Sequence, residues 1–443
     1  MRERTPQVYL NTYLKPDYLR LVTGFAEESA KAFGLNSAEA IKMTLACEEI
    51  FVYLCHLGQS GDTGETITVE ATNGGYYVQL KFLFKVQEFN PRAFNLTATV
   101  SLEDTASLDE MGLLIASRAV DRFYITGDPQ KGLELVLIKE KLYPELVDLK
   151  VHEVKQVKSF NIKSPEPESL KLFCRLVVAH YPSNLYLPVF RFPGKVVDMV
   201  SSGEYGATVA FSDRDQIGGG IVWRWVGEKT VESFGPYLFN QPHQPVGSDL
   251  ATGLLDSCLG RIAKTDAIGL IHRYATPELP QGYFESLGSI DFIQPDGMTK
   301  PWPVYYRQLN EDLGCQVWAH PDLESFLKEE YKRLFFAREI HLASYEGEQR
   351  PPFSVFAPQF DRTNGQITLR AIWDGADAAE NLAQHIKVLK ADSLRNIFFE
   401  VDLAHAWQAN LMPALLENHF HPRLILPYGG DSDIVVFQYK ETL

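Results

Sequence analysis

Residues 218–239 read GGGIVWRWVGEKTVESFGPYLF, and this stretch decides the fold of the middle of the chain. It contains two apolar runs, 220–226 and 230–238, that are rich in β-branched and aromatic residues. Such runs favour strands, and Gly227 and Glu228 supply a turn between them. The stretch therefore predicts two neighbouring strands.

The segment downstream of these strands predicts an α/β crossover. A polar, proline-rich loop, NQPHQPVGSD, occupies 240–249. A helix, a short buried strand and a second helix are expected at 250–264, 267–275 and 277–287, and the second helix should end at Gly288 in a left-handed cap. The loop would leave the sheet at its carboxyl edge, where α/β proteins usually bind ligands.

This order of elements resembles the core of the GNAT acyltransferases. In that family the corresponding loop carries Q/R-x-x-G-x-G/A, whose backbone N–H groups hold the pyrophosphate of acyl-CoA. The resemblance assigns this role to Gln244, Gly247 and Ser248, but Pro245 lacks an N–H donor and Asp249 places a carboxylate beside the phosphate position. Two interpretations stay open: an acyl-CoA site, or an Asp-capped helix behind a proline-rich loop.

The resemblance extends over about 157–317 and implies acid–base chemistry. Acyl transfer to an amine needs a base for the ammonium proton and an acid that protonates the thiolate. The family often uses a tyrosine near its fourth helix as the acid; here Phe284 stands at that position and Tyr283 comes one residue earlier. Tyr274, at a strand end, and Glu232, on the strand before the loop, are the other candidates. Each is also explained as an ordinary strand residue.

The amino-terminal third contains a glutamate on an apolar helix stripe. Residues 43–58 read MTLACEEIFVYLCHLG, and Glu49 lies four residues after Leu45 and three before Val52. Its carboxylate should therefore point toward the interior or a pocket, where it needs a partner or a ligand. Asn73-Gly74-Gly75 predicts a hairpin between the two strands that follow.

Residues 1 to about 142 resemble the anti-sigma-factor branch of the histidine kinase-like ATPases. The likeness lies in the helix just described and in MGLLIASRAVDRFYITGDPQKGLELVLIKEK, which resembles the family's closing helix and strand. It implies that Glu49 activates the attacking hydroxyl and that the residue four positions later holds magnesium. That residue is Tyr53, which offers no amide oxygen to a hard cation.

The remaining nucleotide-binding positions are also altered. The family has Asp-x-Gly after the central strand, where this chain reads KVQEFNPRAF, and G-x-G before the later helix, where Gly112 remains. No glycine occurs between Tyr76 and Met111, so a flexible phosphate-enclosing lid is not expected. We therefore expect loss of magnesium-dependent catalysis. ATP binding without turnover through Tyr53 and Gly112, and a domain kept for protein contacts, are the two alternatives.

The carboxyl-terminal part predicts a charged helix at 321–338, an exposed linker at 346–352 and a further α/β segment from 353. That segment repeats the middle domain's order, including helices at 377–390 and 404–417, and is expected to be a second, shorter GNAT-like copy. Its loop, DGADAAEN, carries three carboxylates that would repel pyrophosphate. A scaffold or dimer surface is expected there. The nearby histidines His405, His419 and His421 lack a cysteine or a well-placed carboxylate, so no metal site is expected.

Composition limits the function further. The chain has 443 residues, a net charge of −15 and no basic run, which argues against nucleic acid or an anionic membrane as the main partner. Its five cysteines contain no C-x-x-C pair, so neither a zinc cage nor a disulfide framework is indicated. The segment MRERTPQVYL has no apolar core and no run is long enough to span a bilayer. A cytoplasmic location is expected.

These observations predict an α+β and α/β multidomain protein, with a kinase-like sandwich followed by two GNAT-like mixed-sheet domains. The expected boundaries are 1–145, 155–320, 321–352 and 353–443. The favoured function is a cytoplasmic regulatory or signalling protein that binds a protein partner or a small molecule and could form a homodimer. The alternative is an N-acyltransferase that uses acyl-CoA in its middle domain. Acyl-CoA and ATP are the candidate cofactors.

Overall fold

The computed structural model describes most of the chain, namely residues 6–58, 65–86, 89–98, 105–128, 131–147, 157, 159–239, 249–294, 296–344, 347 and 349–441. The chain forms two compact units. The first comprises Met1–Leu142, Gln349–Pro358 and Arg370–Val388, and the second comprises Tyr143–Glu348, Gln359–Leu369 and Leu389–Leu443. Each unit therefore contains segments that are far apart in the sequence.

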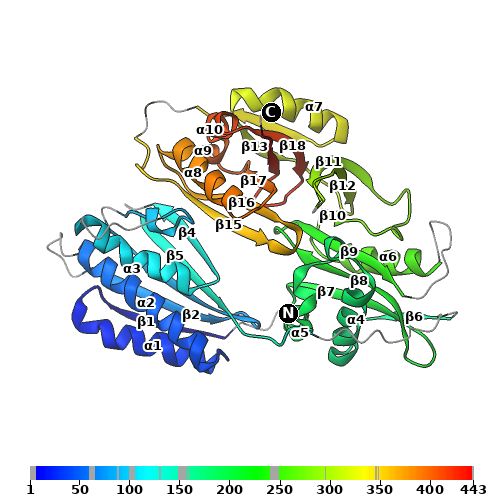
Figure 1. Ribbon diagram of the computed structural model, residues 1–443, viewed down its shortest axis with the longest axis horizontal. Coiled ribbons are helices and arrows are strands. Elements are labelled where there is room, and N and C mark those ends of the chain that lie inside the picture. Colours follow the sequence, from blue (N-terminus) through cyan, green and yellow to red (C-terminus); the bar gives the residue numbers. More distant parts are fainter. Residues whose placement is uncertain are drawn as a thin grey trace. The chain divides into compact units, whose positions relative to one another are not determined.

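The first unit contains an antiparallel sheet with helices on one face (Figure 1). The sheet order is β1-β2-β3-β5-β4, with the strands β1 (Gln7–Tyr13), β2 (Thr66–Asn73), β3 (Tyr77–Phe84), β4 (Arg122–Asp128) and β5 (Gly132–Glu140). The helices are α1 (Leu19–Ala32), α2 (Ser37–Gly58) and α3 (Thr105–Ala119), with short 3-10 turns η1 (Pro16–Tyr18) and η2 (Arg92–Phe94).

The core of this unit follows from the strand pattern. Alternate residues of β3, among them Leu80 and Phe82, are fully buried while the residues between them are only half-buried, as expected of a sheet covered on one face. The hairpin between β2 and β3 is confirmed, because the Asn73 side-chain oxygen accepts a hydrogen bond from the Gly75 N–H at 3.0 Å and Gly75 has a φ of +83°.

The second unit contains a seven-stranded sheet with the order β11-β12-β10-β9-β8-β7-β6. Its strands are β6 (Asn161–Lys163), β7 (Tyr205–Phe211), β8 (Ile217–Trp225), β9 (Thr230–Leu238), β10 (Gly269–Tyr274), β11 (Glu285–Ile293) and β12 (Thr299–Gln308). Strands β9 and β10 are parallel, and the other neighbouring strands in this sheet pair antiparallel.

The helices that pack on this sheet lie in two of the connections between its strands. Helix α6 (Asp249–Ile262) connects the parallel strands β9 and β10, whereas α4 (Pro167–His180) and α5 (Pro193–Ser201) lie between β6 and β7 in the chain, with the 3-10 turns η3 (Ser183–Leu185) and η4 (Pro188–Arg191) between them. A Cβ at Gly220 of β8 would lie 2.6 Å from the Phe173 ring of α4. The glycine run 218–220 therefore allows the helix to approach the sheet closely.

The predicted helix at 277–287 is wrong. Residues 277–284 form turns and Glu285–Ile293 form strand β11, which pairs antiparallel with β12. Pro280 lacks the backbone N–H that a residue inside such a helix would donate to the preceding turn. Gly288, with a φ of +124°, lies at an irregularity in the pairing of β11 with β12 and not at a helix end. Long-range pairing with β12 thus outweighs the local helical pattern.

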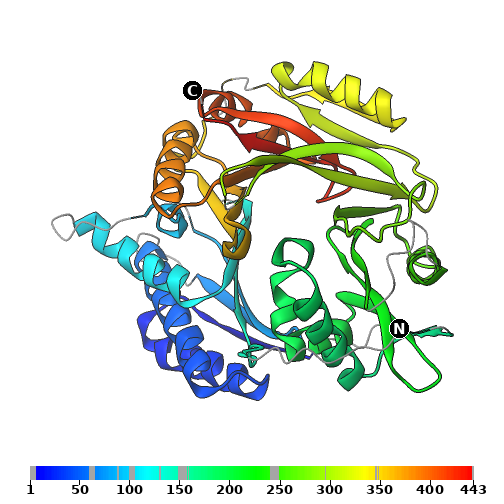
Figure 2. The same cartoon turned by 45° about the vertical axis from the view of Figure 1, so that its right-hand side comes forward.

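The carboxyl-terminal sheet has the order β15-β16-β17-β19-β18. Its strands are β15 (Val355–Asp361), β16 (Gln366–Trp373), β17 (Asn396–Asp402), β18 (Phe420–Leu426) and β19 (Ile434–Tyr439); β15 and β16 contribute residues to both units. Figure 2 shows β11 and β12 running beside β18. The Asp291 N–H of β11 donates to the Gln438 side-chain oxygen of β19 at 3.0 Å. This hydrogen bond links the seven-stranded sheet to the carboxyl-terminal sheet.

The remaining elements complete this unit. Helix α7 (Pro321–Leu334) ends four residues before its predicted end, where Phe335 adopts a left-handed conformation. It is followed by β14 (Arg338–Leu342), which pairs in parallel with β13 (Cys315–Ala319). The 3-10 turn η5 (Arg362–Asn364) precedes β16, and α8 (Ala378–Ala391) follows it. The helix predicted at 404–417 is instead two short ones, α9 (Ala406–Ala409) and α10 (Met412–Glu417), because Pro413 interrupts it.

Among the described residues, none of the helices is both long enough and apolar enough to cross a membrane.

Candidate ligand-binding site

Helices α2 and α3 bring Glu49 and Gly112 together in the first unit. A Cβ at Gly112 would lie 2.6 Å from the Glu49 Oε2 atom, so the glycine lets α3 pack directly on the carboxylate. Burial and the neighbouring Glu48 raise the pKa of Glu49 above its ordinary value. The structure thus places a half-buried carboxyl at the position that the ATPase resemblance assigned to a base.

The position expected to hold magnesium is closed by packing around Tyr53. The Tyr53 hydroxyl accepts a hydrogen bond from the Asn90 backbone N–H at 3.2 Å, and its ring meets the Phe89 ring edge-on at a centroid distance of 6.2 Å. The Asn90 side chain donates to the Glu110 Oε1 atom at 2.7 Å. The aromatic side chain of Tyr53, whose hydroxyl is hydrogen-bonded, therefore stands at the position where the resemblance would require an amide oxygen to bind magnesium.

A distant segment of the chain packs against this region within the first unit. The Phe89 ring contacts the Trp373 ring at 6.1 Å, and Arg92 lies 5.0 Å above the Phe353 ring. The side chain of Asn95 donates to the Ser354 carbonyl at 2.7 Å. The segment that replaces the family's Asp-x-Gly is thus covered by residues that the sequence predicted to belong to a separate domain.

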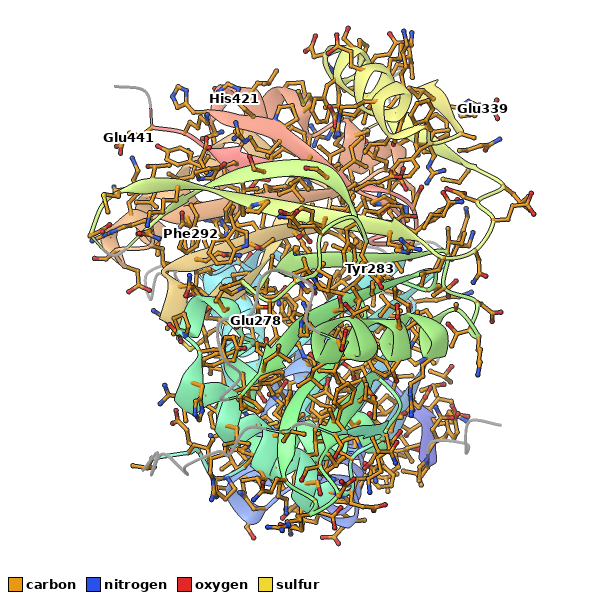
Figure 3. All side chains as sticks on the ribbon, turned by 90° about the vertical axis from the view of Figure 1, so that its right-hand side faces the viewer. Glu278, Tyr283, Phe292, Glu339, His421 and Glu441 are labelled. Carbon is orange, nitrogen blue, oxygen red and sulfur yellow. The ribbon has the colours of Figure 1, made fainter. Side chains whose placement is uncertain are left out.

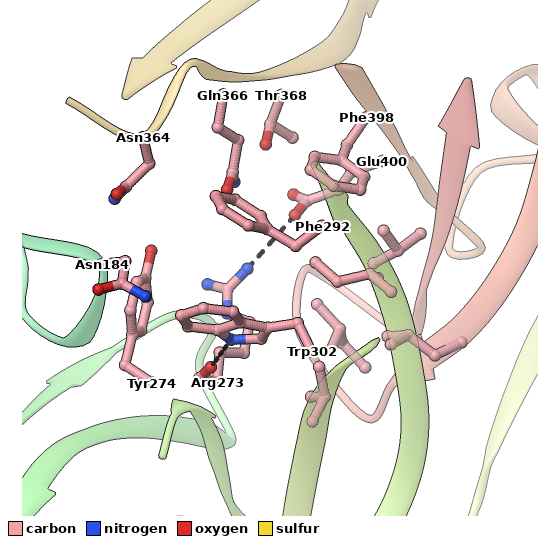
Figure 4. Close-up of a pocket in the computed structure, with 15 residues that line it drawn as sticks. Asn184, Arg273, Tyr274, Phe292, Trp302, Asn364, Gln366, Thr368, Phe398 and Glu400 are labelled. Atoms are coloured by element: carbon pink, nitrogen blue, oxygen red, sulfur yellow. Dashed lines mark hydrogen bonds and ion pairs between the residues drawn. The ribbon is translucent and has the colours of Figure 1, made fainter. Parts of the chain in front are cut away.

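A second site lies in the second unit, in the space between the seven-stranded sheet and the carboxyl-terminal sheet (Figure 4). Strands β10, β11 and β12 line one side, and β16, β17, β18 and β19 line the other. About 600 Å³ of space, open solvent included, lies among the side chains of this site. It is lined by Asn184, Arg273, Tyr274, Ile290, Phe292, Trp302, Val304, Asn364, Gln366, Thr368, Phe398, Glu400, Leu424, Leu426 and Val436.

Two charged side chains, Arg273 and Glu400, line this pocket, and Arg273 is held by a buried carboxylate beneath it. Glu232 of β9 is fully buried; Arg224 contacts its Oε2 atom at 2.7 Å and the Arg273 Nε contacts its Oε1 atom at 2.5 Å. The Arg273 Nη1 atom lies 3.7 Å from the Glu400 Oε1 atom of β17. Arg273 therefore links a buried carboxylate beneath the pocket to a second carboxylate on the opposite sheet.

The electrostatics of Glu232 and Tyr274 follow from this burial. Burial alone would raise the pKa of Glu232, but Arg273 and Arg224 outweigh it and lower the pKa to about 2. Burial raises the pKa of Tyr274 to about 12, against the opposing effect of Arg273. At neutral pH the first group is therefore an ionised carboxylate and the second a neutral phenol.

Aromatic rings and amides complete the pocket wall. Trp302 of β12 lies 5.2 Å from the Phe292 ring and meets the Tyr274 ring edge-on at 6.4 Å. The Trp302 indole N–H donates to the Arg273 backbone carbonyl, which fixes the ring beside the guanidinium. The side chains of Asn184, Asn364 and Gln366 form the polar rim of the pocket (Figure 4).

The sequence-predicted acyl-transfer residues do not all meet at this pocket. Tyr274 lines it and Glu232 lies beneath it, whereas Tyr283 lies apart from Phe292 (Figure 3) and packs against the core under α6. The predicted acyl-CoA-binding residues Gln244, Gly247 and Ser248 lie outside the described residues.

Three pocket residues were missed by sequence reasoning. Arg273 stands inside the predicted strand 267–275, and Glu400 stands inside the apolar run NIFFEV. A charge within a buried strand needs a partner, and this signal was available at both positions. Trp302 has no such local signal, because nothing near it in the sequence places its ring beside the guanidinium.

A serine and a histidine come within hydrogen-bonding distance elsewhere in this unit. The Ser233 hydroxyl lies 2.8 Å from the His272 Nδ1 atom, a distance suited to a nucleophile and its base. Both side chains have no solvent exposure, and burial lowers the pKa of His272 to about 4. The pair therefore has no access to substrate and serves packing.

Among the described residues, Asp402, His405 and Asp431 form one cluster that could hold a metal ion. The Asp402 carboxylate already accepts hydrogen bonds from the backbone N–H groups of Ala404, Asp431 and Ser432. These hydrogen bonds show that the Asp402 carboxylate stabilises the two loops that meet at this cluster. The expectation that no metal binds here stays a prediction.

Comparison with known proteins identifies the class of the amino-terminal domain. Residues 13–139 match the family model of the histidine kinase-like ATPase domain, so the first unit contains a domain of this class. A comparison with curated proteins finds no significant match.

Several GNAT acetyltransferases are among the similar solved structures. They include a phosphinothricin acetyltransferase from Sinorhizobium meliloti solved with AcCoA (15% identity, 35% of this chain and 90% of that chain, TM-score 0.27). An aminoglycoside 6'-acetyltransferase type Ii matches at 16% identity over 34% of this chain and 99% of that chain (TM-score 0.28). A GNAT-family acetyltransferase from Staphylococcus aureus matches at 14% identity over 34% of this chain and 100% of that chain (TM-score 0.25).

Proposed function

We propose that this is a regulatory protein that binds a small molecule in the pocket between the seven-stranded sheet and the carboxyl-terminal sheet. The observation that carries the proposal is the pocket itself, in which the paired charges of Arg273 and Glu400 meet a wall of aromatic and aliphatic side chains. A mostly apolar cavity with a few convergent polar groups is the usual form of a small-molecule site. The regulatory output would pass to a protein partner.

The histidine kinase-like domain is proposed to act without ATP turnover. Tyr53 stands at the position that the family resemblance assigns to the magnesium ligand, and the rings of Phe89 and Trp373 pack next to it. A domain of this form would serve protein contacts. In support, its helices α1 and α2 expose Leu21 and Ile41 to 51% and 60%.

Acyl transfer is not favoured by the chemistry of the candidate residues. A general base works best with a pKa near the operating pH, and the pKa of Glu232 is held far below it. The Tyr181 hydroxyl also donates to the Leu238 carbonyl at 3.2 Å and accepts from the Leu238 N–H at 2.7 Å. These backbone groups at the end of β9 are therefore not free to pair with a ligand laid alongside the strand.

The proposal is tested by screening a small-molecule collection with thermal unfolding of the whole chain. Thr368 lines the pocket, whereas Thr363, five residues earlier, is exposed outside it. A ligand of the pocket should raise the unfolding midpoint of the native protein and of Thr363→Trp, but not of Thr368→Trp, because the indole fills the cavity. Retained stabilisation of Thr368→Trp, or measurable phosphoryl or acetyl transfer by the native protein, would contradict the proposal.

An N-acyltransferase remains the second candidate, because the parallel strands β9 and β10 are connected through α6 as the resemblance requires. Calorimetry with acetyl-CoA decides between the two. Binding that is lost in Gln244→Ala and Gly247→Asp would support the transferase. No binding by the native protein would remove it.

A further inference from the structure

Strand β16 turns a polar face toward the pocket. Gln366 and Thr368 line the cavity, whereas Ile367 and Leu369 are fully buried on the other face of the sheet, as the two-residue period of a strand requires. The opposite wall of the pocket is the aromatic and aliphatic surface of β11 and β12, including Trp302 (Figure 4). Polar side chains of one sheet therefore face an apolar wall of the other.

Two of the amides in this pocket are available to a ligand. Among the residues that the structure describes, the half-buried side chains of Asn184 and Gln366 make no hydrogen bond, and neither does the Thr368 hydroxyl. The third amide, of Asn364, differs because its Nδ2 atom donates to the Asp361 Oδ2 atom at 2.7 Å. An amide that loses water without gaining a partner is destabilising. A ligand that supplies the partner removes this cost.

The charged side chains of the wall are already engaged within the protein. The Arg273 Nε and Nη2 atoms donate to Glu232 at 2.5 and 3.0 Å, and its Nη1 atom lies 3.7 Å from the Glu400 Oε1 atom. Glu400 makes a further interaction besides this one. Recognition of a ligand therefore falls to the neutral hydrogen-bonding groups.

The aromatic wall is a fixed surface for a flat ligand. The Trp302 indole N–H donates to the Arg273 carbonyl, and its ring lies 5.2 Å from the Phe292 ring and 6.4 Å from the Tyr274 ring. Rings held in this way lose little freedom when a ligand packs against them. Heteroaromatic rings stack favourably on aromatic side chains whatever their sequence of ring atoms. The wall thus suits a planar aromatic molecule.

The amides determine what the edge of that molecule must carry. A primary amide has a carbonyl acceptor beside N–H donors, so it pairs best with an edge on which a donor stands beside an acceptor. Carboxamides and the edges of nucleobases have this arrangement and carry no charge. A hydrocarbon ring would fill the same space but would leave the amides without partners.

We infer that the pocket binds an uncharged planar aromatic molecule whose edge carries an N–H donor beside an acceptor, as in a nucleobase or an aromatic carboxamide. Its ring packs on Trp302, and its edge is hydrogen-bonded by Gln366 and Asn184. This inference rests on the proposed function and specifies the ligand class of the same site.

Calorimetry on the whole protein tests the inference with two matched pairs of compounds. The first pair is adenine and 6-methylpurine, and the second is benzamide and acetophenone. In each pair a methyl group replaces the NH₂ group, so that the ring and its shape stay while the donor is lost. In at least one pair the NH₂ compound should bind about tenfold or more tightly. Thr368→Trp should abolish this binding and Thr363→Trp should preserve it.

Gln366→Met provides the second measurement, because methionine has a similar length and no amide. The NH₂ compound should bind about tenfold more weakly to this variant, whereas its methyl analogue should bind within about twofold of its affinity for the native protein. Asn184→Leu tests the second amide in the same way. Gln359→Met, an exposed change on β15 outside the pocket, should leave both affinities unchanged.

The outcomes separate the inference from the proposed function. If the methyl analogues bind as tightly as the NH₂ compounds, or if Gln366→Met and Asn184→Leu both leave the discrimination intact, the inference is overturned while the pocket remains a ligand site. Binding that persists in Thr368→Trp overturns it too, because that binding lies elsewhere. The inference also fails alone if both pairs are silent but another compound stabilises the native protein and not Thr368→Trp. If no compound does so, the proposed function fails with it.

Discussion

Glu232 shows how a single residue controls the pocket. Its carboxylate is fully buried and holds both Arg224 and Arg273, so that the second guanidinium is oriented toward the cavity. Sequence reasoning selected Glu232 as a possible catalytic base. Its surroundings instead suit a structural anion, because the two guanidinium groups stabilise the charged form far more than burial destabilises it.

Replacement of this residue should be costly. Glu232→Gln leaves two guanidinium groups facing a neutral amide, and breaking a buried ion pair in this way typically costs about 3 to 5 kcal/mol. Because the Arg224 and Arg273 side chains are 22% and 28% exposed, we expect a loss of roughly 2 to 4 kcal/mol in the free energy of unfolding. Urea denaturation measures it, with the exposed turn variant Glu228→Gln as the control. A loss equal to that of the control would exclude the anchoring role.

His272 should make the protein sensitive to mild acid. Burial lowers its pKa to about 4 from an ordinary value of 6.5, so below pH 6.5 the unfolded chain takes up a proton that the folded chain does not. Its contribution to stability is complete above pH 6.5 and is lost as the pH falls toward 4, by roughly 3 kcal/mol in total. His272→Gln can still bond Ser233 and should show a shallower fall of unfolding free energy between pH 6.5 and 4.5. Parallel curves for the two proteins would contradict this.

At the scale of elements, helix α2 places Tyr53 in a packed aromatic cluster. Tyr53 bonds Asn90, and Phe89 in turn packs on Trp373. A single substitution would therefore not open the cluster to a ligand.

Tyr53→Asn restores the missing amide and tests this closure. We expect no magnesium-dependent ATP binding by calorimetry, because the aromatic cluster around Phe89 still fills the region. We also expect a loss of about 2 to 4 kcal/mol of stability, because a large side chain that is 5% exposed is removed from the core. The appearance of ATP binding in this variant would mean that only the metal ligand had been missing.

At the scale of the whole molecule, the first unit is assembled from both ends of the sequence. Val355 and Trp373 belong to the same buried cluster as Phe51 and Phe82. The Asn381 side chain donates to the Ser354 carbonyl at 2.9 Å and to the Asn95 side-chain oxygen at 3.2 Å. The histidine kinase-like domain is therefore stabilised by segments located more than 200 residues further along the chain.

This assembly predicts the behaviour of a fragment. Residues 1–145 alone would expose the surface around Phe89 and Asn95 that the carboxyl-terminal segments cover. We expect the fragment to unfold at a lower temperature than the corresponding transition of the whole chain and to bind a hydrophobic dye. Thermal unfolding monitored by circular dichroism, with dye fluorescence in parallel, measures both. An equally stable fragment that binds no dye would show that these contacts contribute little.

Sequence reasoning succeeded where local patterns carry the information. Strand β9 was predicted with its observed bounds, and helix α6 was predicted within two residues at each end. The replacement at Tyr53 could likewise be detected from one helix, because it depends on residue chemistry at a fixed spacing. Such features depend on neighbours within a few residues, and their periodicity is written directly in the chain.

The sequence by itself therefore determined the helix that carries Glu49 and Tyr53, the strands β8 and β9 and the crossover helix α6. Only the tertiary structure decided that Glu285–Ile293 is a strand, that Trp373 joins the first unit, and that Arg273 meets Glu400 in a pocket. Each of these depends on contacts between residues far apart in the chain. A charge or an aromatic ring in one strand indicates that a partner is needed, but folding alone selects which distant residue becomes that partner.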